Sequence, residues 1–264
     1  MNINLIHFDT SVGVKKPRTM LKSSIDSCPF CDVEHLTDII DTDGDIIFLK
    51  NKYVVVEGSD QFVIIEGSEC HSDMPRYSKE KMRRLIRFGL KHWKNLLDSG
   101  KYEDVLFFKN YGELSGGTIR HPHMQLVGFP KLNRDLLFDP IELHGEIIFE
   151  SDGVEINIST TPRVGFGEIN IIPPAGNFID SKSLDTFADF IQIGIDYLTK
   201  HFRKDLSSYN IFFYHRENSE GIDQIYAKLI PRFATSPYFV GYNIHFVPNN
   251  VKTLAEEIRQ IYFS

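Results

Sequence analysis

The 264-residue sequence lacks three features that would each point to a different class of protein. It contains only three cysteines, an odd number that does not make a disulfide framework. No apolar run approaches the roughly 20 residues that span a bilayer. The start of the chain does not combine the basic and apolar regions of a secretory signal. We therefore expect a cytoplasmic protein that does not engage a membrane.

An excess of positive charge is also missing. The chain has 29 Lys and Arg against 36 Asp and Glu, which gives a net charge of -7. A broad electrostatic surface for nucleic acid is therefore not expected, and any anion has to be bound at a local site. The many cations between Arg76 and Lys94 are interpreted as the solvated face of a helix, opposite its apolar stripe.

What the sequence does contain is enough apolar material for a substantial core, with 42% hydrophobic and 12% aromatic residues. A loop-like segment of about thirty residues is followed by a turn signal at residues 42–45, and short β-rich runs then predict antiparallel strands. These runs are residues 46–49, 53–56 and 62–65. The three-and-four spacing of apolar residues then predicts a helix over 78–97, with Ser78 as its N-cap and Gly100 as its end.

The second half of the chain repeats the order of the first. Each of the following segments has a counterpart: 62–65 in 169–172, 78–97 in 184–198, 105–108 in 210–213, and 123–126 in 226–229. The alternative is chance, because two α+β units of common type can look alike. We favour a duplication, with an α+β fold built from residues 1–130 and 131–264. An extra hairpin at 147–158 and a short helix at 253–262 complete the prediction.

The strongest chemical signal is His121-Pro122-His123-Met124-Gln125. In a strand predicted over 121–129, residues two apart point to the same face, so two imidazoles and one amide project together. A neutral imidazole can ligate a metal, attack phosphorus or shuttle a proton, and an amide can hold a phosphoryl oxygen without adding charge. The alternative is that these side chains merely line a solvated strand.

Cys28 and Cys31 have the spacing of a metal knuckle, which supplies half of a tetrahedral zinc site. No second C-x-x-C is present, so the other ligands must be histidines distant in the sequence, for which His71 and His121 are best placed. A redox pair is the alternative interpretation, although no βαβ pattern surrounds the motif. Cys70 is interpreted as a buried small hydrophobe.

The loop over residues 110–118 runs into the histidine strand. Its glycines allow positive φ and close backbone approach, so Ser115, Thr118 and free N–H groups could cradle a phosphate. A plain hairpin turn is the alternative.

Taken together, C-P-F-C, a lone histidine after strand 62–65, an Asn-x-Gly loop and H-P-H-x-Q closely resemble the galactose-1-phosphate uridylyltransferase family of the histidine triad (HIT) superfamily. The resemblance covers most of the chain and includes residues 238–242. It implies a HIT-like fold of two antiparallel-sheet-plus-helix units in one pseudo-symmetric module. Residues 1–130 would be the catalytic half and 131–264 a non-catalytic half.

The resemblance also implies the roles of particular residues. Zinc would be held by Cys28, Cys31, His71 and His121; His123 would be the nucleophile and Gln125 the phosphoryl-binding residue; Asn51, Asn110, Ser115 and Thr118 would surround the nucleotide and its phosphates; and Lys16 and Arg18, with Lys15, would lie near the diphosphate. The implied partner is a nucleotide or nucleoside diphosphate sugar, and the implied assembly is a homodimer.

In such enzymes the histidine attacks the α-phosphorus of a nucleoside diphosphate sugar, and a second sugar phosphate then takes the nucleotide. Glutamine in place of a third triad histidine supplies no acid to activate water, which favours transfer over hydrolysis. Two alternatives stay open. One is a phosphorylase or hydrolase of dinucleoside polyphosphates or nucleotide sugars, and the other is a degenerate nucleotide-binding module without turnover.

The departures from the family pattern limit what the resemblance implies. Pro237 and Asn243 stand where the transferases carry Lys and Glu that contact the hexose, so a place in galactose metabolism does not follow. Gln224 and Tyr226 replace a His-x-His pair that some members use for a second metal. Phe178 occupies the position that echoes His71. We therefore expect metal and chemistry only in the first half.

Overall fold

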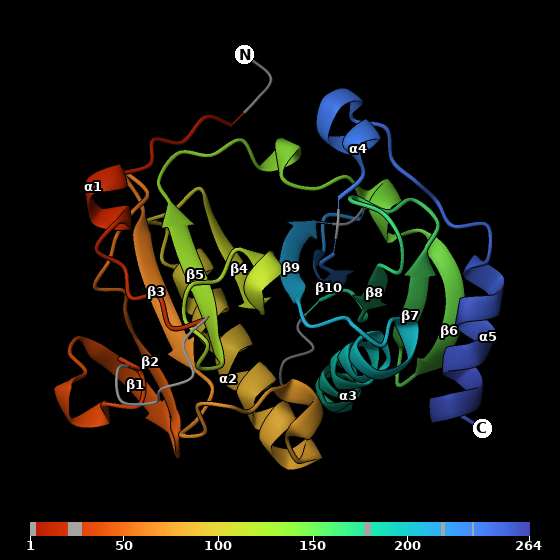
Figure 1. Ribbon diagram of the computed structural model, residues 1–264, viewed down its shortest axis with the longest axis horizontal. Coiled ribbons are helices and arrows are strands. Elements are labelled where there is room, and N and C mark those ends of the chain that lie inside the picture. Colours follow the sequence, from red (N-terminus) through yellow and green to blue (C-terminus); the bar gives the residue numbers. More distant parts are fainter. Residues whose placement is uncertain (1–3, 21–27, 177–180, 218–219, 234) are drawn as a thin grey trace.

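The structure, a computed structural model, describes residues 4–20, 28–176, 181–217, 220–233 and 235–264. Within these residues, ten strands form one antiparallel sheet in the order β1-β2-β3-β5-β4-β9-β10-β8-β7-β6 (Figure 1). The strands are β1 (Ile39–Asp43), β2 (Ile46–Lys50), β3 (Asp60–Ile65), β4 (Asp104–Tyr111), β5 (His123–Phe129), β6 (Gly145–Ser151), β7 (Val154–Ser159), β8 (Ile169–Ile172), β9 (Tyr209–Glu217) and β10 (Asp223–Pro231). The predicted α+β class is confirmed.

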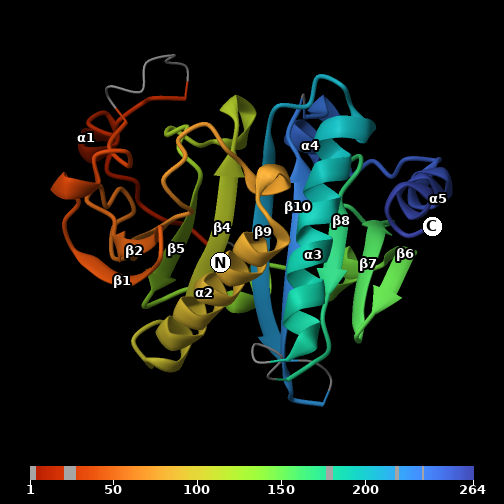
Figure 2. The ribbon, with the colours of Figure 1, turned by 90° about the horizontal axis from the view of Figure 1, so that it is seen from below.

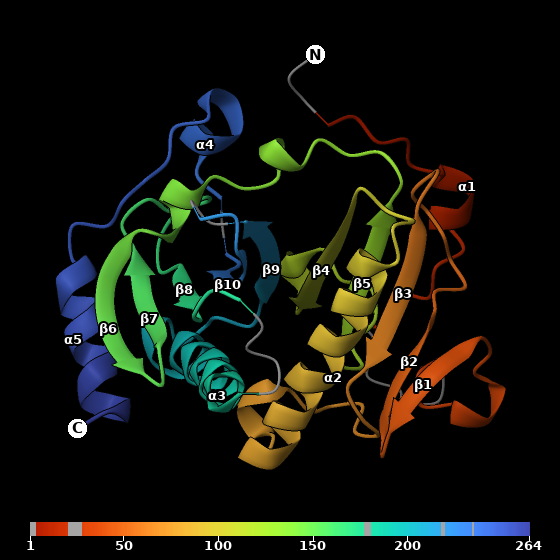
Figure 3. The ribbon, with the colours of Figure 1, turned by 180° about the vertical axis from the view of Figure 1, so that it is seen from behind.

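Two long helices cover one face of the sheet (Figure 2). They are α2 (Lys79–Asp98) and α3 (Lys182–Tyr197). Ser78 caps α2, because its Oγ accepts a hydrogen bond from the N–H of Lys81 at 3.1 Å, as predicted. The shorter helices are α1 (Thr10–Gly13), α4 (Pro237–Tyr242) and α5 (Val251–Tyr262), and α5 packs against β6 and β7 at the far edge (Figure 3).

The main core lies between the sheet and these helices. Met124 and Leu126 of β5 are fully buried in it, together with Leu85 and Ile86 of α2. Because side chains alternate along a strand, His123, Gln125 and Val127 point to the other face of the sheet. The packing of β5 against α2 therefore fixes the direction of the histidine row.

Residues 53–56 do not form the predicted strand. Only Val56 makes an isolated bridge, to Phe8, and the N–H of Asp9 bonds the carbonyl of Val55 at 2.8 Å. The segment bends because the Asn51 side chain accepts a hydrogen bond from the N–H of Tyr53 at 2.9 Å. It therefore pairs with the N-terminal arm instead of the sheet.

Every Lys and Arg of α2 is paired with a carboxylate. The pairs are Lys79 with Asp189, Lys81 with Asp45, Arg83 with Asp185 and Asp189, Arg84 with Asp43 and Asp45, Arg87 with Asp185, Lys91 with Asp41, and Lys94 with Asp98. Most of these acids belong to α3 or to the β1–β2 hairpin. The cations of α2 thus join the helix to its neighbours and do not form an open basic surface.

The order of the strands is mirrored about the centre of the sheet. β4 pairs with β9, and Phe108 lies opposite Phe212. The order outward from β4 is β5, β3, β2 and β1, and outward from β9 it is β10, β8, β7 and β6. The predicted correspondence of segments therefore has a counterpart in the order of the strands. Phe178, predicted to echo His71, lies outside the described residues.

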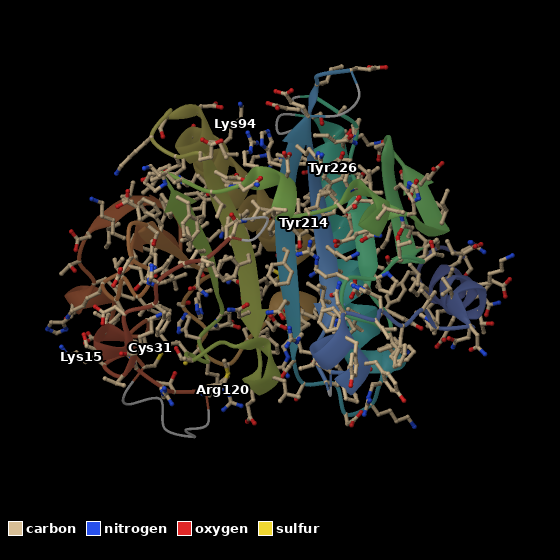
Figure 4. All side chains as sticks on the ribbon, turned by 90° about the horizontal axis from the view of Figure 1, so that it is seen from above. Lys15, Cys31, Lys94, Arg120, Tyr214 and Tyr226 are labelled. Carbon is tan, nitrogen blue, oxygen red and sulfur yellow. The ribbon has the colours of Figure 1, made fainter. Side chains whose placement is uncertain are left out.

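In the second half, the face that corresponds to the histidine row is filled. Tyr226 and Tyr214 lie opposite each other on β10 and β9 (Figure 4). Both pack with Phe138 and Leu143 from the connecting segment. Further along β10, the fully buried ammonium of Lys228 contacts Glu168 at 3.1 Å and Asn170 at 2.9 Å. Tyr226 and Lys228 thus fill the positions that correspond to His123 and Gln125.

Candidate functional site

β5 carries the histidine row between two neighbouring strands. His123 lies opposite Ile65 of β3, and Gln125 lies opposite both Val63 and Phe108. His123 and Gln125 line a cavity of about 390 Å³ on the face away from α2 and α3. The strand begins at His123, two residues later than predicted, because Pro122 has no N–H to give to the ladder.

The imidazole of His123 is held in one tautomer. Its Nδ1–H donates to the backbone carbonyl of His121 at 2.8 Å, which leaves Nε2 unprotonated. Burial, together with the positive charges of Lys109 and Lys16, lowers the pKa of His123 to about 4 against the opposing effect of that hydrogen bond. The ring is therefore neutral at pH 7, with a free lone pair at Nε2, as a nitrogen nucleophile requires.

Phe30, which sequence reasoning left without a role, packs against this imidazole. Its ring is edge-on to His123, with ring centroids 5.3 Å apart, and it also contacts His121 at 6.0 Å. Phe30 lies between Cys28 and Cys31, so the turn that presents the two thiols also places an aromatic ring on the histidine pair. The C-P-F-C spacing indicates the thiols but not this contact.

Four potential ligands gather beside the histidine pair. The ligand atoms of Cys28, Cys31, Cys70 and His121 all lie within 4.8 Å of one another. Nε2–H of His121 donates to the carbonyl of Gly67 at 2.7 Å, so Nδ1 is free, and it lies 3.7 Å from the Sγ of Cys28 and 3.5 Å from that of Cys31. Metal-ligating histidines typically donate their other ring N–H to an acceptor in this way, which fixes the tautomer.

The structure corrects the predicted ligand set at one position. Cys70, interpreted from the sequence as a buried hydrophobe, brings its sulfur into the cluster, whereas the side chain of His71 is exposed and lines a different cavity. The two residues are neighbours after β3, and their side chains leave the chain in different directions. The group is therefore Cys₃His instead of Cys₂His₂.

The donor set fits a thiophilic divalent cation such as Zn²⁺. Burial would raise the pKa of Cys28, but the contact with the His121 imidazole and hydrogen bonds from the N–H groups of Phe30 and Cys31 together lower it to about 7. Burial, together with the neighbouring sulfurs of Cys31 and Cys28, raises the pKa of Cys70 to about 12. Three thiols this close cannot all be ionised without a cation, because their negative charges repel one another. A bound cation compensates these charges.

The cavity of His123 brings together only some of the predicted substrate-binding residues. Asn51, Asn110, Thr118 and Lys16 line the cavity of His123, whereas Ser115 and Arg18 are not among its lining residues. The hydroxyl of Ser115 donates to the carbonyl of Gly112 at 2.6 Å and accepts from the N–H of Gly117 at 3.2 Å. Ser115 thus shapes the loop from within, and Arg18 is exposed outside the cavity.

A residue of the second half holds this loop in place. The side-chain amide of Asn210 on β9 donates to Oδ1 of Asn110 at 2.6 Å and to the carbonyl of Ser115 at 3.0 Å. Asn210 is 1% exposed, and nothing in its sequence context marked it. The pairing of β4 with β9 brings it there, so only the assembled sheet shows the contact.

Two family models together match nearly the whole chain. Residues 8–132 match the model described as the N-terminal domain of DUF4931, a domain of unknown function, and residues 136–263 match the model of its C-terminal domain. A crystal structure of a DUF4931 family protein from Bacillus cereus is 36% identical and has a TM-score of 0.74, covering 86% of this chain and all (100%) of that one.

Two solved structures from Arabidopsis thaliana share the fold at lower identity. A galt-like protein is 16% identical with a TM-score of 0.71, covering 97% of this chain and 98% of that one. An ADP-glucose phosphorylase with bound ADP-glucose is 15% identical with a TM-score of 0.70, covering 91% and 92%. These likenesses confirm the resemblance to the uridylyltransferase family at the level of the fold.

One further similarity is partial. A 95-residue stretch, 34% of this chain, is 40% identical to part of a di-/tripeptide transporter from Lactobacillus helveticus, and it spans 18% of that protein's length. Within the part of the chain that the structure describes, no helix is long and apolar enough to cross a bilayer.

Proposed function

Since the chain belongs to the DUF4931 family, whose two domain models it matches almost from end to end, we propose that it is a nucleotidyltransferase acting through His123. The single observation that carries this proposal is the state of that imidazole. The imidazole is neutral, and its Nδ1–H donates to the His121 carbonyl. The cavity that it lines also presents amides, hydroxyls and lysines. Nothing about the reaction follows from the fold alone.

In the proposed reaction, Nε2 of His123 attacks the α-phosphorus of a nucleoside diphosphate sugar. An N–P bond forms, the bond from phosphorus to the bridging oxygen breaks, and a sugar phosphate leaves with that electron pair. An oxygen of an acceptor phosphate then attacks the same phosphorus and regenerates the imidazole. Each displacement is easier than the direct transfer because the intermediate divides the reaction into two steps.

The other residues of the cavity suit the two ends of such a substrate. Gln125, two residues beyond His123 on the same face, can donate its amide to the transferred phosphoryl group. Thr118 and Lys16 can bind phosphate oxygens, and the side-chain amides of Asn51 and Asn110 can donate to the nucleoside. Apolar side chains of the same cavity, among them Leu49 and Val55, would contact the flat base.

A hexose 1-phosphate is the acceptor class that the family resemblance implies, with galactose as one candidate. Pro237 and Asn243 are not among the residues that line the His123 cavity, however. This favours a second candidate, in which the acceptor is inorganic phosphate and the reaction is a phosphorolysis of the nucleotide sugar. Both reactions use the same His123 intermediate and differ only in what attacks it.

We assign zinc to Cys28, Cys31, Cys70 and His121 as a structural cofactor. The four donors leave no position for a substrate, as in closed structural sites. When bound, the ion ties the N-terminal segment to the start of β5. The chain's own contribution is to hold the His121 carbonyl and the Phe30 ring against His123, and no step of the reaction passes through the metal.

The proposal extends to the architecture. The mirrored strand order supports two HIT-like units, residues 1–130 with the chemistry and 131–264 without it. Exposed apolar side chains on α4, Tyr238, Val240 and Tyr242, support a homodimer. The free cysteines suit the reducing cytoplasm, which we propose as the location.

The test is to incubate the pure protein with nucleoside diphosphate sugars labelled at the α-phosphorus. We expect a covalent adduct that is stable in base and labile in acid, and its absence from His123→Ala. His144→Ala is the matched control, because His144 is exposed and contributes only backbone bonds. An unlabelled protein across a broad panel of bases and sugars, or a fully labelled His123→Ala, would refute the proposal.

The acceptor is then identified from the isolated adduct. Release by a sugar phosphate alone indicates a transferase, release by inorganic phosphate a phosphorylase, and spontaneous release in buffer a hydrolase. Because Gln125 supplies no acid to activate water, we expect the slowest release in buffer.

A further inference from the structure

A second cavity, of about 550 Å³, lies at one end of the sheet on the side of the helices. It is formed by residues from the loop before α2, from the turn after β4, and from the end of α3 with the π-helical turn η7 (Leu198–Phe202). Tyr111 of β4 lines it, whereas its neighbour Asn110 lines the His123 cavity. Successive side chains of a strand point to opposite faces, so the two cavities lie on opposite sides of β4.

The second cavity gathers positive charge. Its lining includes Arg76, Arg120, Lys200 and His71, the exposed histidine that does not join the cysteine cluster. Burial raises the pKa of the Tyr111 phenol, and the charges of Arg76 and Arg120 both oppose this rise, so both guanidinium groups lie within electrostatic range of that ring. A local concentration of cations is unexpected in a chain with a net charge of -7.

Within the described part of the chain, these two arginines have no carboxylate partner. Among the described residues, the Arg120 guanidinium has no ion pair or hydrogen bond, and that of Arg76 reaches only the carbonyl of His71, at 3.3 Å. Every cation on α2, by contrast, has a carboxylate partner. Among the described residues, these two fork-shaped donors thus lack a carboxylate, whereas the cations of α2 are paired with one.

The carboxylates near the cavity are mostly engaged elsewhere. Both oxygens of Asp73 accept from the Tyr209 hydroxyl at 2.7 Å, and the ammonium of Lys109 lies 3.5 Å from Asp73. Lys200 is paired with Asp196. Glu113, at the rim, is the remaining acid of the lining. A dianion would thus meet two free guanidinium groups with little competing negative charge.

From this arrangement we infer that the second cavity is a binding site for a small phosphorylated anion, with its phosphoryl group between Arg76 and Arg120. A phosphomonoester or diphosphate matches two planar forks better than a monocarboxylate does, because it offers more oxygens and more charge. The hydroxyls of Tyr111 and Ser207 would complete the donors. The inference does not depend on the chemistry proposed for His123.

The site adjoins the cysteine cluster. Cys70 belongs both to that cluster and to the lining of the cavity, and Arg120 directly precedes His121 (Figure 4 shows Arg120 and Cys31 at the same end of the molecule). A ligand held by Arg120 would therefore touch the chain next to the ligands of the metal. Binding of this ligand would therefore affect the structure at the start of β5.

The test is calorimetric titration of inorganic pyrophosphate into the full-length, metal-loaded protein in buffer free of phosphate. We expect the Arg76→Gln/Arg120→Gln variant to lose a binding event, with affinity reduced at least about tenfold, because each charge-assisted contact is lost. The Arg76→Lys/Arg120→Lys variant should show a smaller loss, since it keeps charge but not the forks. Both sites are exposed, so neither variant should unfold.

Two controls locate the binding. Lys94→Gln removes an exposed cation from α2 and should leave the affinity unchanged. Lys16→Gln acts only on the His123 cavity, so it should leave the event that depends on Arg76 and Arg120 intact. Unchanged binding in the double glutamine variant, an equal loss in Lys94→Gln, or a complete loss in Lys16→Gln would each overturn the inference, whatever the outcome for the His123 adduct.

Discussion

Cys70 and His71 show where single residues go beyond what the sequence can predict. The sequence indicates that strand 62–65 is followed by a ligand, because two thiols and one histidine leave a zinc site incomplete. It does not indicate which of two adjacent donors turns inward, since that depends on backbone torsions between Gly67 and Ser72. Phe30 is a similar case, because its contact with His123 exists only once the knuckle has folded against β5.

The ligand set makes a direct prediction. Cys70→Ser should weaken zinc binding by at least about 100-fold, since even the loss of an outer hydrogen-bond partner costs 10- to 100-fold. His71→Ala should bind zinc as the unmodified protein does. The check is metal content by mass spectrometry together with competition against a chromophoric chelator. The reverse pattern, with His71→Ala losing the metal, would restore the Cys₂His₂ set.

His92 provides a prediction about pH. Burial lowers the pKa of His92. The carboxylate of Asp41, 2.9 Å from Nε2, opposes this shift, but Lys91 is paired with the same carboxylate and its positive charge also lowers the pKa of His92. Neutral His92 makes its full contribution to the free energy of unfolding above about pH 6.5, the pKa of a histidine in the unfolded chain. This contribution is lost as the pH falls through the lower pKa that His92 has in the folded protein. The free energy of unfolding should therefore decrease from pH 7 to pH 5.

The variant His92→Gln isolates this effect, because all other titrating groups are common to both proteins. Urea unfolding at a series of pH values should give a shallower slope for the variant below pH 6.5. The ring of His92 packs on Phe48 and Phe88, at 4.3 and 4.5 Å between centroids, so the variant should also be less stable at pH 7. Parallel pH curves would show that His92 does not titrate in this range.

At the scale of elements, periodicity was a reliable guide where packing and local signals agreed. The helix over 78–97 has an apolar stripe, a serine cap and a glycine beyond its end, and α2 runs over Lys79–Asp98. Residues 53–56 have the composition of a strand, but the Asn51 turn directs them away from the sheet. Strand composition alone cannot show which neighbour supplies the hydrogen bonds.

The pairing of α2 with α3 can be tested at Asp189. Its two oxygens accept from Nε and Nη2 of Arg83 at 2.9 and 2.7 Å, and its side chain is 16% exposed. Asp189→Asn should lower the free energy of unfolding by about 1 kcal/mol, because it removes a partly buried bidentate pair.

Asp98→Asn is the matched control. It removes the exposed pair with Lys94 within α2, which should contribute about 0.5 kcal/mol or less. Chemical unfolding of both variants gives the comparison. An equal and small change in both would mean that the α2–α3 ion pairs do not hold the helices together.

At the scale of the whole molecule, the repeat predicted from the sequence has a counterpart in the mirrored strand order, but it does not indicate the contact between the halves. The prediction that the second half lacks chemistry remains a proposal, supported by the aromatic side chains that fill the equivalent face. What the sequence could not show is that β9 also supports the first half. Long-range pairing such as Asn210 with Asn110 follows from the register of β4 against β9, which no local pattern encodes.

This contact makes the second half a positioning element for the first, and it carries the last prediction. Asn210→Ala removes the hydrogen bonds to Asn110 and Ser115, so the loop should lose its fixed geometry. We expect the free energy of unfolding to fall by about 1–3 kcal/mol and the rate of adduct formation at His123 to fall by about ten- to 100-fold. Zinc content should not change.

Asn157→Ala separates this role from a general loss of stability. Asn157 is equally buried and donates to the Leu143 carbonyl at 3.0 Å, but its bonds remain within the second half. It should destabilise the protein to a similar extent while the rate of adduct formation per folded molecule stays the same. If both variants slow the reaction equally, or neither does, the second half stabilises the sheet without positioning the loop, because Asn210 reaches across the β4–β9 junction to Asn110 of the His123 cavity whereas Asn157 does not.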